Sequence, residues 1–282
     1  MSALRRLVGD PDQFLTRWPD RPTVYTVNRD QLAELFDRSA ARRIVTDPTM
    51  RPFDLGMVRD GAPTPTQPDA DHPTDTLVLN GLHLTWPPLQ NAARQLGSQL
   101  GHPITANVYL TPPASTGYDF HWDTHHVFLA QVEGTKVWKL HPPVFVDPLE
   151  QHRWTAVGFT PEELDRVKRD SETIALTAGQ TLFIPRGWVH AGSTTEDEHS
   201  LHITLGVQLL TLHWVVQQLV GQAANDLDVR AALPPTLGAY PIESVIENAR
   251  TALRSYLDAL DLDKVGPAIQ NGRELAVLRA YR

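Results

Sequence analysis

The part of the sequence that most constrains the fold follows Gly101, where the chain breaks into short β-like runs. Turn residues separate each run from the next, and the runs are residues 104–110, 126–132, 136–140, 172–176, 181–184 and 202–209. Strands of this length at this spacing predict an antiparallel sandwich or barrel. A hydrophobic strand of the same kind is expected earlier, at residues 23–27.

Helical patterns flank this β region on both sides. Before it, apolar residues recur at helical spacing from Pro87 to Leu100, and Gly101 then acts as a stop signal. Other helices are expected at residues 12–18, 30–36, 245–260 and 273–281, and a Pro- and Asp-rich loop at 59–75. We therefore expect a mainly β fold with flanking helices: a domain over residues 1–210 with its barrel core at 76–210, then a helical region over 211–282.

Composition excludes several kinds of site. The 282 residues contain no Cys, which removes disulfides, thiolate metal sites and Cys nucleophiles, so a metal would need His, Asp or Glu. The net charge of −8 does not suit direct binding to a nucleic-acid backbone. No apolar run reaches the ~20 residues of a membrane helix, and the start lacks the apolar segment of a signal peptide. We expect a cytoplasmic protein that does not bind membranes.

Three residues form a candidate metal site. His121 and Asp123 are two apart on a predicted strand, so their side chains point to the same face. His125 shares that face, but positions four apart on a strand are separated by ~13 Å, too far for one ion to join them. The third ligand is therefore expected from another strand, and His190 follows a hydrophobic strand and a Pro-Arg-Gly turn. Two His and one carboxylate suit Fe(II), but they also bind Zn, Mn, Co or Ni.

Around these residues the sequence resembles the JmjC-type ribosomal oxygenases of the cupin superfamily. The resemblance is dense over residues 76–207 and thinner over 10–60. Its motifs occur in order: Val78-Leu79-Asn80-Gly81, Asn107-Val108-Tyr109-Leu110-Thr111-Pro112-Pro113, His121-Trp122-Asp123, Leu129-Ala130-Gln131-Val132-Glu133-Gly134-Thr135-Lys136, Gly179 to His190, and Ser200-Leu201-His202-Ile203-Thr204.

The resemblance implies a double-stranded β-helix, a jelly-roll barrel, that binds Fe(II) and 2-oxoglutarate. It implies hydroxylation of an Arg or His side chain in a ribosomal protein, with release of succinate and CO2. The iron ligands would be His121, Asp123 and His190. The other implied roles are 2-oxoglutarate binding by Lys136, and lining of the same 2-oxoglutarate pocket by Asn107, Tyr109 and Thr204.

The alternation of side chains along a strand predicts, independently of the resemblance, that Lys136 points inward. It shares a strand face with Trp138 and Leu140, and we expect it to open the second strand of a hairpin turned at residues 133–135. The competing interpretation is a lysine at a hairpin end in solvent. Four further residues are candidates for the substrate pocket: Trp122, His125, Trp188 and His202.

The substrate is the least determined feature. Only about 75 residues follow the barrel. They leave room for the family's helical dimerisation region but not for its C-terminal winged-helix module, so we expect a homodimer. A peptide natural product or a free amino-acid-like molecule therefore stays open as the substrate, beside a protein. A metal-binding cupin without redox chemistry is the alternative from another functional class.

Overall fold

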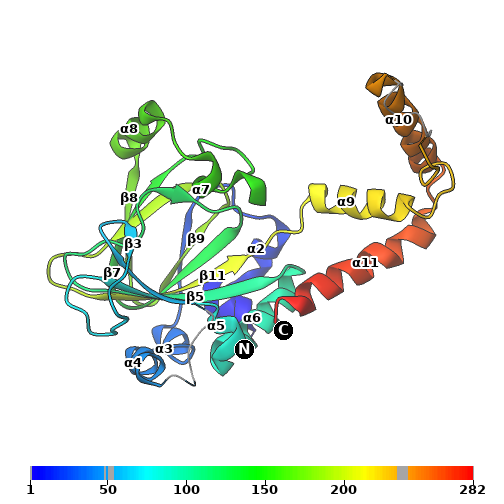
Figure 1. Cartoon of the computed structure of the whole chain (residues 1–282). Coiled ribbons are helices and arrows are strands. Elements are labelled where there is room, and N and C mark those ends of the chain that lie inside the picture. The colour runs from blue at the N-terminus through cyan, green and yellow to red at the C-terminus, as the bar shows by residue number, and fades with distance from the viewer. Residues whose placement is uncertain (1, 48, 50–53, 234–240, 282) are drawn as a thin grey trace. The chain divides into compact units, whose positions relative to one another are not determined.

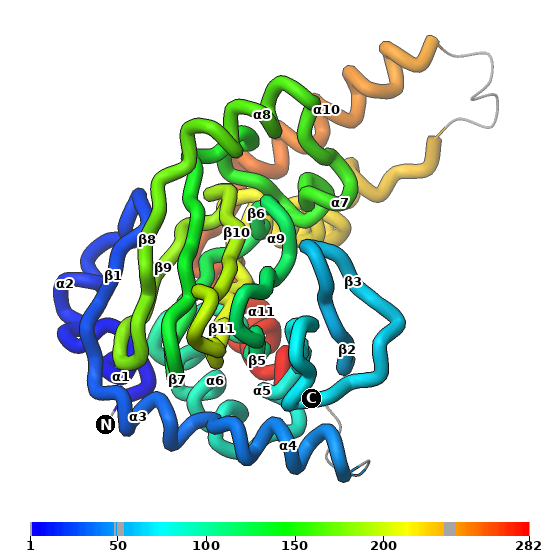
Figure 2. Tube along the Cα trace, turned by 90° about the vertical axis from the view of Figure 1, so that its left-hand side faces the viewer, coloured from blue at the N-terminus to red at the C-terminus, as the bar shows by residue number. Residues whose placement is uncertain are grey.

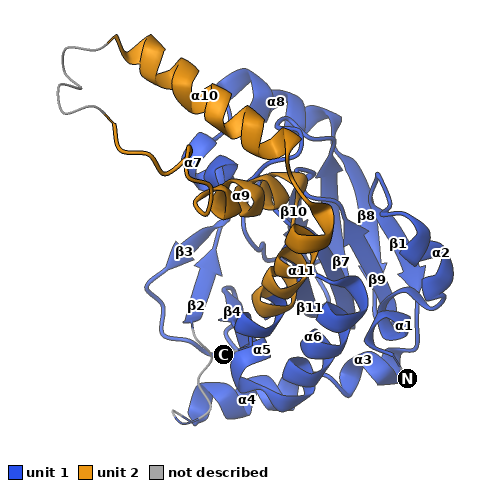
Figure 3. Ribbon diagram, turned by 90° about the vertical axis from the view of Figure 1, so that its right-hand side faces the viewer, with its two compact units in different colours: residues 1–209, 277–282 blue, residues 210–276 orange. Residues whose placement is uncertain are grey.

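The computed structural model describes residues 2–47, 49, 54–233 and 241–281. It contains two compact units, Met1–Leu209 with Val277–Arg282, and Leu210–Ala276, which Figure 3 shows in different colours. The first unit holds every strand among the described residues, and the second holds helices.

One antiparallel sheet dominates the first unit. Its strand order is β1-β9-β7-β11-β5-β4-β2-β3, and Figure 2 shows β9, β7 and β11 running side by side. A second, smaller group of strands, β6, β8 and β10, pairs around the far half of β7. The bounds are β1 Thr23–Thr26, β2 Asp54–Arg59, β3 Ala62–Thr64, β4 Thr76–Asn80, β5 Ile104–Thr111, β6 His121–Trp122, β7 His126–His141, β8 Glu172–Thr177, β9 Gln180–Ile184, β10 Val189–Ser193 and β11 Ser200–Val207.

The predicted hairpin at residues 133–135 is wrong. β7 is one continuous strand that pairs with β9 and β11 through its first half and with β8 and β10 through its second. Gly134 has φ 63°, and a Cβ there would come within 1.8 Å of the His199 carbonyl oxygen. The pairing of β11 with β7 also shifts register between Leu201 and His202. Glycine at this position therefore bends the strand from one sheet into the other and does not reverse it.

Helices cover one face of the large sheet (Figure 1). Leu89, Ala93 and Leu96 of α6 pack there against alternate residues of β5 and β11. Along β5 the buried residues begin with Ile104, Ala106 and Val108, and the residues between them face the opposite side. This alternation leaves the opposite side of the sheet for polar side chains. The helices of this unit are α1 Ala3–Val8, α2 Pro11–Thr16, α3 Arg29–Ala33, α4 Arg38–Thr46, α5 Leu82–Thr85, α6 Pro87–Leu100, α7 Trp154–Val157 and α8 Pro161–Asp170.

The mainly β fold with flanking helices is confirmed, and so is the helix predicted at 87–100. Other features of the first unit differ from expectation. The loop predicted at 59–75 contains the short strand β3. Helix α8 was not predicted, although Thr160 and Glu163 form a capping box with Pro161 at the first helical position, a recognisable helix start.

The second unit is helical, with α9 Leu212–Ala223, α10 Ile242–Asp258 and most of α11 Leu262–Arg279. Helix α11 begins 11 residues before the predicted start at 273 and accommodates Pro267 within it. Several apolar side chains of this unit are exposed, including Leu212, Val216 and Val220 on α9. Among the described residues, no helix combines the length and the apolar character needed to cross a membrane.

Candidate metal centre

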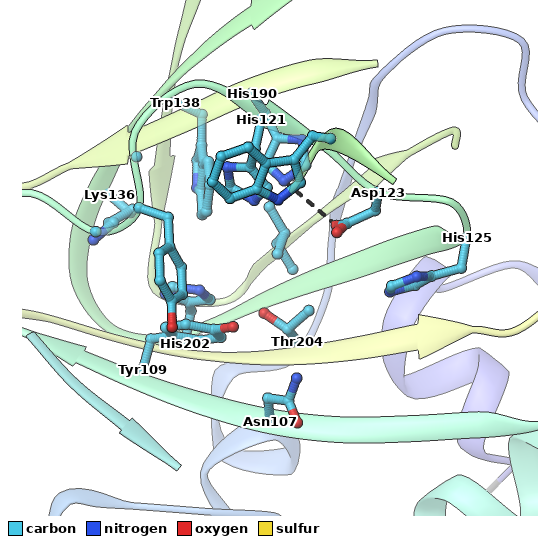
Figure 4. A pocket seen from close by; sticks show the side chains of 15 residues that line it. Asn107, Tyr109, His121, Asp123, His125, Lys136, Trp138, His190, His202 and Thr204 are labelled. Atoms are coloured by element: carbon cyan, nitrogen blue, oxygen red, sulfur yellow. Dashed lines mark ion pairs between the residues drawn. The ribbon is translucent and has the colours of Figure 1, made fainter. Parts of the chain in front are cut away.

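A cavity of about 210 Å³ lies among β5, β7, β10 and β11, on the side of the large sheet away from α5 and α6 (Figure 4). Strands β5 and β11 place alternate side chains in it, because their other residues pack into the helix-covered core. The cavity is lined by His121, Asp123 and His190 and by several of the other residues singled out from the sequence: Asn107, Tyr109, His125, Lys136, His202 and Thr204.

His121, Asp123 and His190 converge as predicted. One ligand atom from each lies within 4.8 Å of the other two, and the described residues contain no other cluster of this kind. His121 of β6 is the cross-strand partner of His190 of β10, which explains how residues so far apart in sequence meet. The His190 Nε2 atom lies 3.6 Å from Asp123 Oδ2.

Backbone carbonyls orient both imidazoles in the same way. His121 Nδ1 donates to the Asp119 carbonyl at 2.7 Å, and His190 Nδ1 donates to the Trp188 carbonyl at 3.0 Å. A carbonyl can only accept, so each Nδ1 carries the hydrogen and each Nε2 keeps a lone pair for a metal. Such hydrogen bonds to ligand histidines are the usual outer support of protein metal sites.

The charges of the cluster suit a divalent cation. Burial, with the nearby His121, lowers the pKa of His190 to about 4, so its imidazole is neutral at pH 7. Desolvation raises the pKa of Asp123, but His125, His190 and His121 together bring it below its ordinary value. Two imidazoles and one carboxylate are the donor set that non-haem Fe(II) and related ions take, so these residues fit a metal of this kind.

Lys136 is buried in the same cavity, with 1% of its surface exposed. This excludes the interpretation of a solvent-exposed hairpin lysine. Its Nζ donates to the Thr111 hydroxyl at 2.6 Å, and no carboxylate among the described residues forms an ion pair with it. Burial lowers the pKa of Lys136 to about 7. A buried ammonium without an anion is costly, and a ligand carboxylate would offset that cost.

The remaining predicted lining residues divide between two ends of the cavity (Figure 4). Tyr109 stacks on His202, with ring centroids 4.9 Å apart. Burial, with the charge of Lys136, holds the pKa of His202 well below its usual value. His125 lies at the other end, over Gly206, where a Cβ would come within 2.7 Å of its Nε2. Thr204 lies between these ends, and Asn107 accepts a hydrogen bond from the Gly81 N–H at 3.0 Å.

Trp122 and Trp188 do not line the cavity, which corrects the prediction. Trp122 lies between His121 and Asp123 on the chain, so alternation turns it to the opposite face, where it packs against Phe159 at 4.9 Å. Trp188 packs against a cluster that contains Leu140 and Ile184. Its contribution to the site is the backbone carbonyl that holds His190.

Two aromatic residues beside the metal ligands were not predicted from the sequence. Tyr118 and Trp154 both line the cavity, with ring centroids 6.0 Å and 5.9 Å from that of His121. Trp154 opens the four-residue helix α7, which carries no periodic signal. Tyr118, three residues before His121, could have been included from its position near the metal motif.

Comparison with known proteins agrees with this geometry. Residues 86–215 match the family model of the JmjC domain. The chain is 45% identical over 105 residues to the bifunctional lysine-specific demethylase and histidyl-hydroxylase NO66 of Drosophila yakuba, covering 37% of this chain and 15% of that protein. The NO66 protein of Aedes aegypti is 36% identical over 171 residues, 57% of this chain and 26% of that one. The chain thus spans about a quarter or less of these relatives.

Solved structures extend the likeness in fold beyond the matched segment. The Escherichia coli ribosomal oxygenase YcfD superposes with a TM-score of 0.57 at 17% identity, covering 90% of this chain and 68% of that one. YcfD in complex with cobalt and 2-oxoglutarate gives 0.55 at 18% identity, over 88% and 66%. The resemblance seen in the motifs is confirmed: residues 86–215 match the JmjC domain model, and the fold is similar to that of YcfD.

Proposed function

We propose that this chain is an Fe(II)- and 2-oxoglutarate-dependent oxygenase that hydroxylates an amino-acid side chain of a protein or peptide, releasing succinate and CO2. The observation that carries the proposal is the buried Lys136 ammonium, which shares one cavity with His121, Asp123 and His190. 2-Oxoglutarate has a keto-acid end that chelates metals and a distant carboxylate that needs a cation, and this cavity has groups for both. The JmjC match and the cobalt and 2-oxoglutarate complex of YcfD support the same cofactors.

The chain's residues have separable tasks in this reaction. His121, Asp123 and His190 would hold the iron, and the Nδ1 hydrogen bonds of the two histidines fix their imidazoles. The iron, when bound, supplies the redox chemistry that couples decarboxylation of the keto acid to oxidation of a C–H bond. Lys136 binds and orients the far carboxylate, and the apolar surfaces of Leu129 and Trp138 exclude water from the cavity. No side chain needs to act as a general base.

The substrate side chain that we propose is an Arg or His of a basic protein of the ribosomal kind. The chain's net charge of −8 favours encounter with a basic partner. Beside His121 the cavity has the aromatic rings of Tyr118 and Trp154, which suit the flat face of a guanidinium or imidazole. The names of the relatives, a histidyl-hydroxylase and a ribosomal oxygenase, support the same class.

Anaerobic reconstitution tests this function. The purified chain is loaded with Fe(II) and 2-oxoglutarate, exposed to dioxygen, and assayed for succinate with and without peptides from basic ribosomal proteins. We expect succinate and a +16 Da product on an Arg- or His-containing peptide. Succinate without any modified peptide would point to a peptide natural product or a small molecule instead. Metal binding without succinate would favour the non-redox cupin.

Matched variants separate the roles within that assay. His121→Ala and Asp123→Ala are expected to abolish succinate formation, because each removes a metal ligand. Lys136→Ala is expected mainly to raise the 2-oxoglutarate concentration needed for half-maximal rate. Lys139→Ala is the control, since Lys139 lies on the same strand but on its exposed face. An unchanged 2-oxoglutarate dependence in Lys136→Ala would contradict the proposed pocket.

We also propose that the helical region mediates a homodimer. Leu212, Val216 and Val220 recur every four residues on α9 and form an exposed apolar stripe, and Ile242 and Ile246 are exposed in the same way on α10. Light scattering after size exclusion is expected to give twice the 31.5 kDa chain mass. Val216→Lys with Val220→Lys is expected to give the monomer, and a wild-type monomer would contradict the dimer.

A further inference from the structure

The hairpin turn between β2 and β3 lies beside the segment that leads into His121, and neither residue of the turn lines the metal cavity. Asp60 and Gly61 connect the cross-strand pair Arg59 and Ala62, with φ values of 48° and 83°. Positive φ at both central residues defines the tight hairpin turn for which Asp-Gly is a preferred sequence. The turn therefore presents Gly61 to its neighbours without a side chain.

Gly61 is in close contact with the backbone of Asp119. The Asp119 N–H donates to the Gly61 carbonyl at 3.1 Å, and Gly61 forms a parallel bridge with Tyr118. A Cβ on Gly61 would lie 2.7 Å from Asp119 Cβ and 3.0 Å from Asp119 N. Any side chain at position 61 must therefore displace Asp119.

Asp119 is in turn the residue that orients His121. Its carbonyl accepts the His121 Nδ1 hydrogen at 2.7 Å, and its carboxylate accepts the Phe120 N–H at 2.7 Å. The equivalent bond of His190 goes to Trp188, whose own turn is tied to Asp123 by the Gly187 N–H. Of the two imidazoles, His121 is thus the one whose supporting carbonyl is held by the distant hairpin.

The hairpin itself is anchored next to this turn. Arg59 makes a bidentate ion pair with Asp75, in which Nε lies 2.7 Å from Oδ1 and Nη2 lies 2.8 Å from Oδ2, and the Asp75 side chain is fully buried. Thr66 and Thr74 add hydrogen bonds to the same carboxylate. The segment 59–75, predicted from the sequence to be a Pro- and Asp-rich loop, therefore holds the turn in place.

We propose that Gly61 is a positioning residue for the metal site: by allowing the turn to contact Asp119, it sets the tautomer and direction of the His121 imidazole. The inference rests on the proposed function, in which His121 is a metal ligand. It assigns a role in metal binding to a residue of a separate hairpin. Removal of such outer support typically costs 10–100-fold in metal affinity.

The test measures Co(II) affinity of the apoprotein by competition with a coloured chelator. Gly61→Ala adds the Cβ that meets Asp119, and we expect it to bind Co(II) at least about 10-fold more weakly than wild type. Gly9→Ala is the matched control, because Gly9 also has a positive φ, of 71°, but its Cβ would meet its nearest neighbour only at 3.6 Å. We expect the control to retain wild-type affinity.

A second variant and a second readout cover loss of folding. Gly61→Asn keeps the offending Cβ while tolerating positive φ better than Ala does, so it also weakens Co(II) binding if the contact matters. In the proton NMR spectrum of the Co(II) protein, each ligand histidine gives an exchangeable, paramagnetically shifted Nδ1–H signal. We expect Gly61→Asn to move the His121 signal and leave the His190 signal in place, which a general loss of stability would not do.

The outcomes separate this inference from the proposed function. Wild-type protein that binds no Co(II) overturns the proposed function and this inference with it. Wild-type protein that binds Co(II), with Gly61 variants of equal affinity and unmoved His121 signal, overturns only the positioning role.

Discussion

Gly192 of β10 lies directly against the stem of Lys136 on β7, so that a Cβ at position 192 would come within 2.9 Å of Lys136 Cε. The same Cβ would lie 2.9 Å from Trp138 Cζ3. Gly117, whose N–H donates to the Gly192 carbonyl at 2.9 Å, is also near: a Cβ on it would lie 3.8 Å from Lys136 Nζ, an ordinary contact distance. The Lys136 side chain thus has its space because Gly192 lacks a side chain.

Gly192→Ala tests this arrangement. The added methyl must displace Lys136 or Trp138, so we expect the dissociation constant for 2-oxoglutarate to rise by about 10-fold or more, a cost of about 1.4 kcal/mol. Calorimetric titration of the metal-loaded protein measures it. Gly56→Ala is the control, since a Cβ there meets no atom within 4 Å. Unchanged affinity in Gly192→Ala would mean that Lys136 does not need its present position.

Lys136→Met is expected to stabilise the apoprotein while weakening 2-oxoglutarate binding. The folded chain holds the pKa of Lys136 at about 7, below its ordinary 10.5, because of burial. Between these values the unfolded chain binds a proton that the folded chain does not, so the free energy of unfolding rises with pH from about 7 to 10.5. In the wild type this rise amounts to up to about 1.4 kcal/mol per pH unit. Lys136→Met cannot titrate at this position, so its free energy of unfolding lacks this rise. Urea unfolding at pH 7 and 9 measures the free energy of unfolding of Lys136→Met, with Lys139→Met as the control.

2-Oxoglutarate binding is expected to take up a proton at alkaline pH. The ligand carboxylate favours the charged ammonium and raises the pKa of Lys136 from about 7, so above pH 7 binding and protonation are coupled. Affinity then falls as pH rises, towards tenfold per unit, with about 0.9 proton taken up at pH 8. Calorimetry in two buffers of different ionisation enthalpy measures that number. If no proton is taken up, Lys136 is not neutral in the ligand-free protein at this pH, which would contradict the prediction.

Two-residue alternation explains why much of the metal site could be predicted. It placed His121 and Asp123 on one face, turned Lys136 inward with Trp138, and required the third ligand to come from another strand. The same rule, applied to Trp122, would have excluded it from the cavity. The pairing of β6 with β10, which brings His190 to His121, is a long-range contact that strand alternation alone does not predict.

Local sequence patterns gave a wrong prediction, or none, where the structure depends on contacts between distant residues. Glu133-Gly134-Thr135 has the composition of a turn, but the positive φ of Gly134 bends a single strand, because β8 and β10 continue its pairing. Trp154 lies in a segment without periodicity, and tertiary packing alone brings it to His121. The Gly61 contact joins residues 58 positions apart, which no local pattern records.

His126 connects pH to the turn that supports the metal ligands. Its Nδ1 accepts the Arg186 N–H at 2.9 Å, and its ring packs between Trp18 and Phe183. Burial, with the charge of Arg186, lowers the pKa of His126 to about 3. The next residue of the turn, Gly187, donates its N–H to the Asp123 carbonyl at 2.9 Å. Protonation of His126 would therefore remove one of the bonds that hold this turn.

We expect acid to weaken the fold through this residue. Between pH 6.5 and about 3 the unfolded chain protonates His126 and the folded chain does not, so the free energy of unfolding falls as pH falls, by up to about 1.4 kcal/mol per unit. His126→Gln keeps an acceptor for Arg186 but cannot titrate, so its stability should fall less steeply in urea unfolding from pH 7 to 4.5. His213→Gln, at an exposed position of α9, should follow wild type. Equal slopes in all three proteins would show that His126 does not couple protonation to folding.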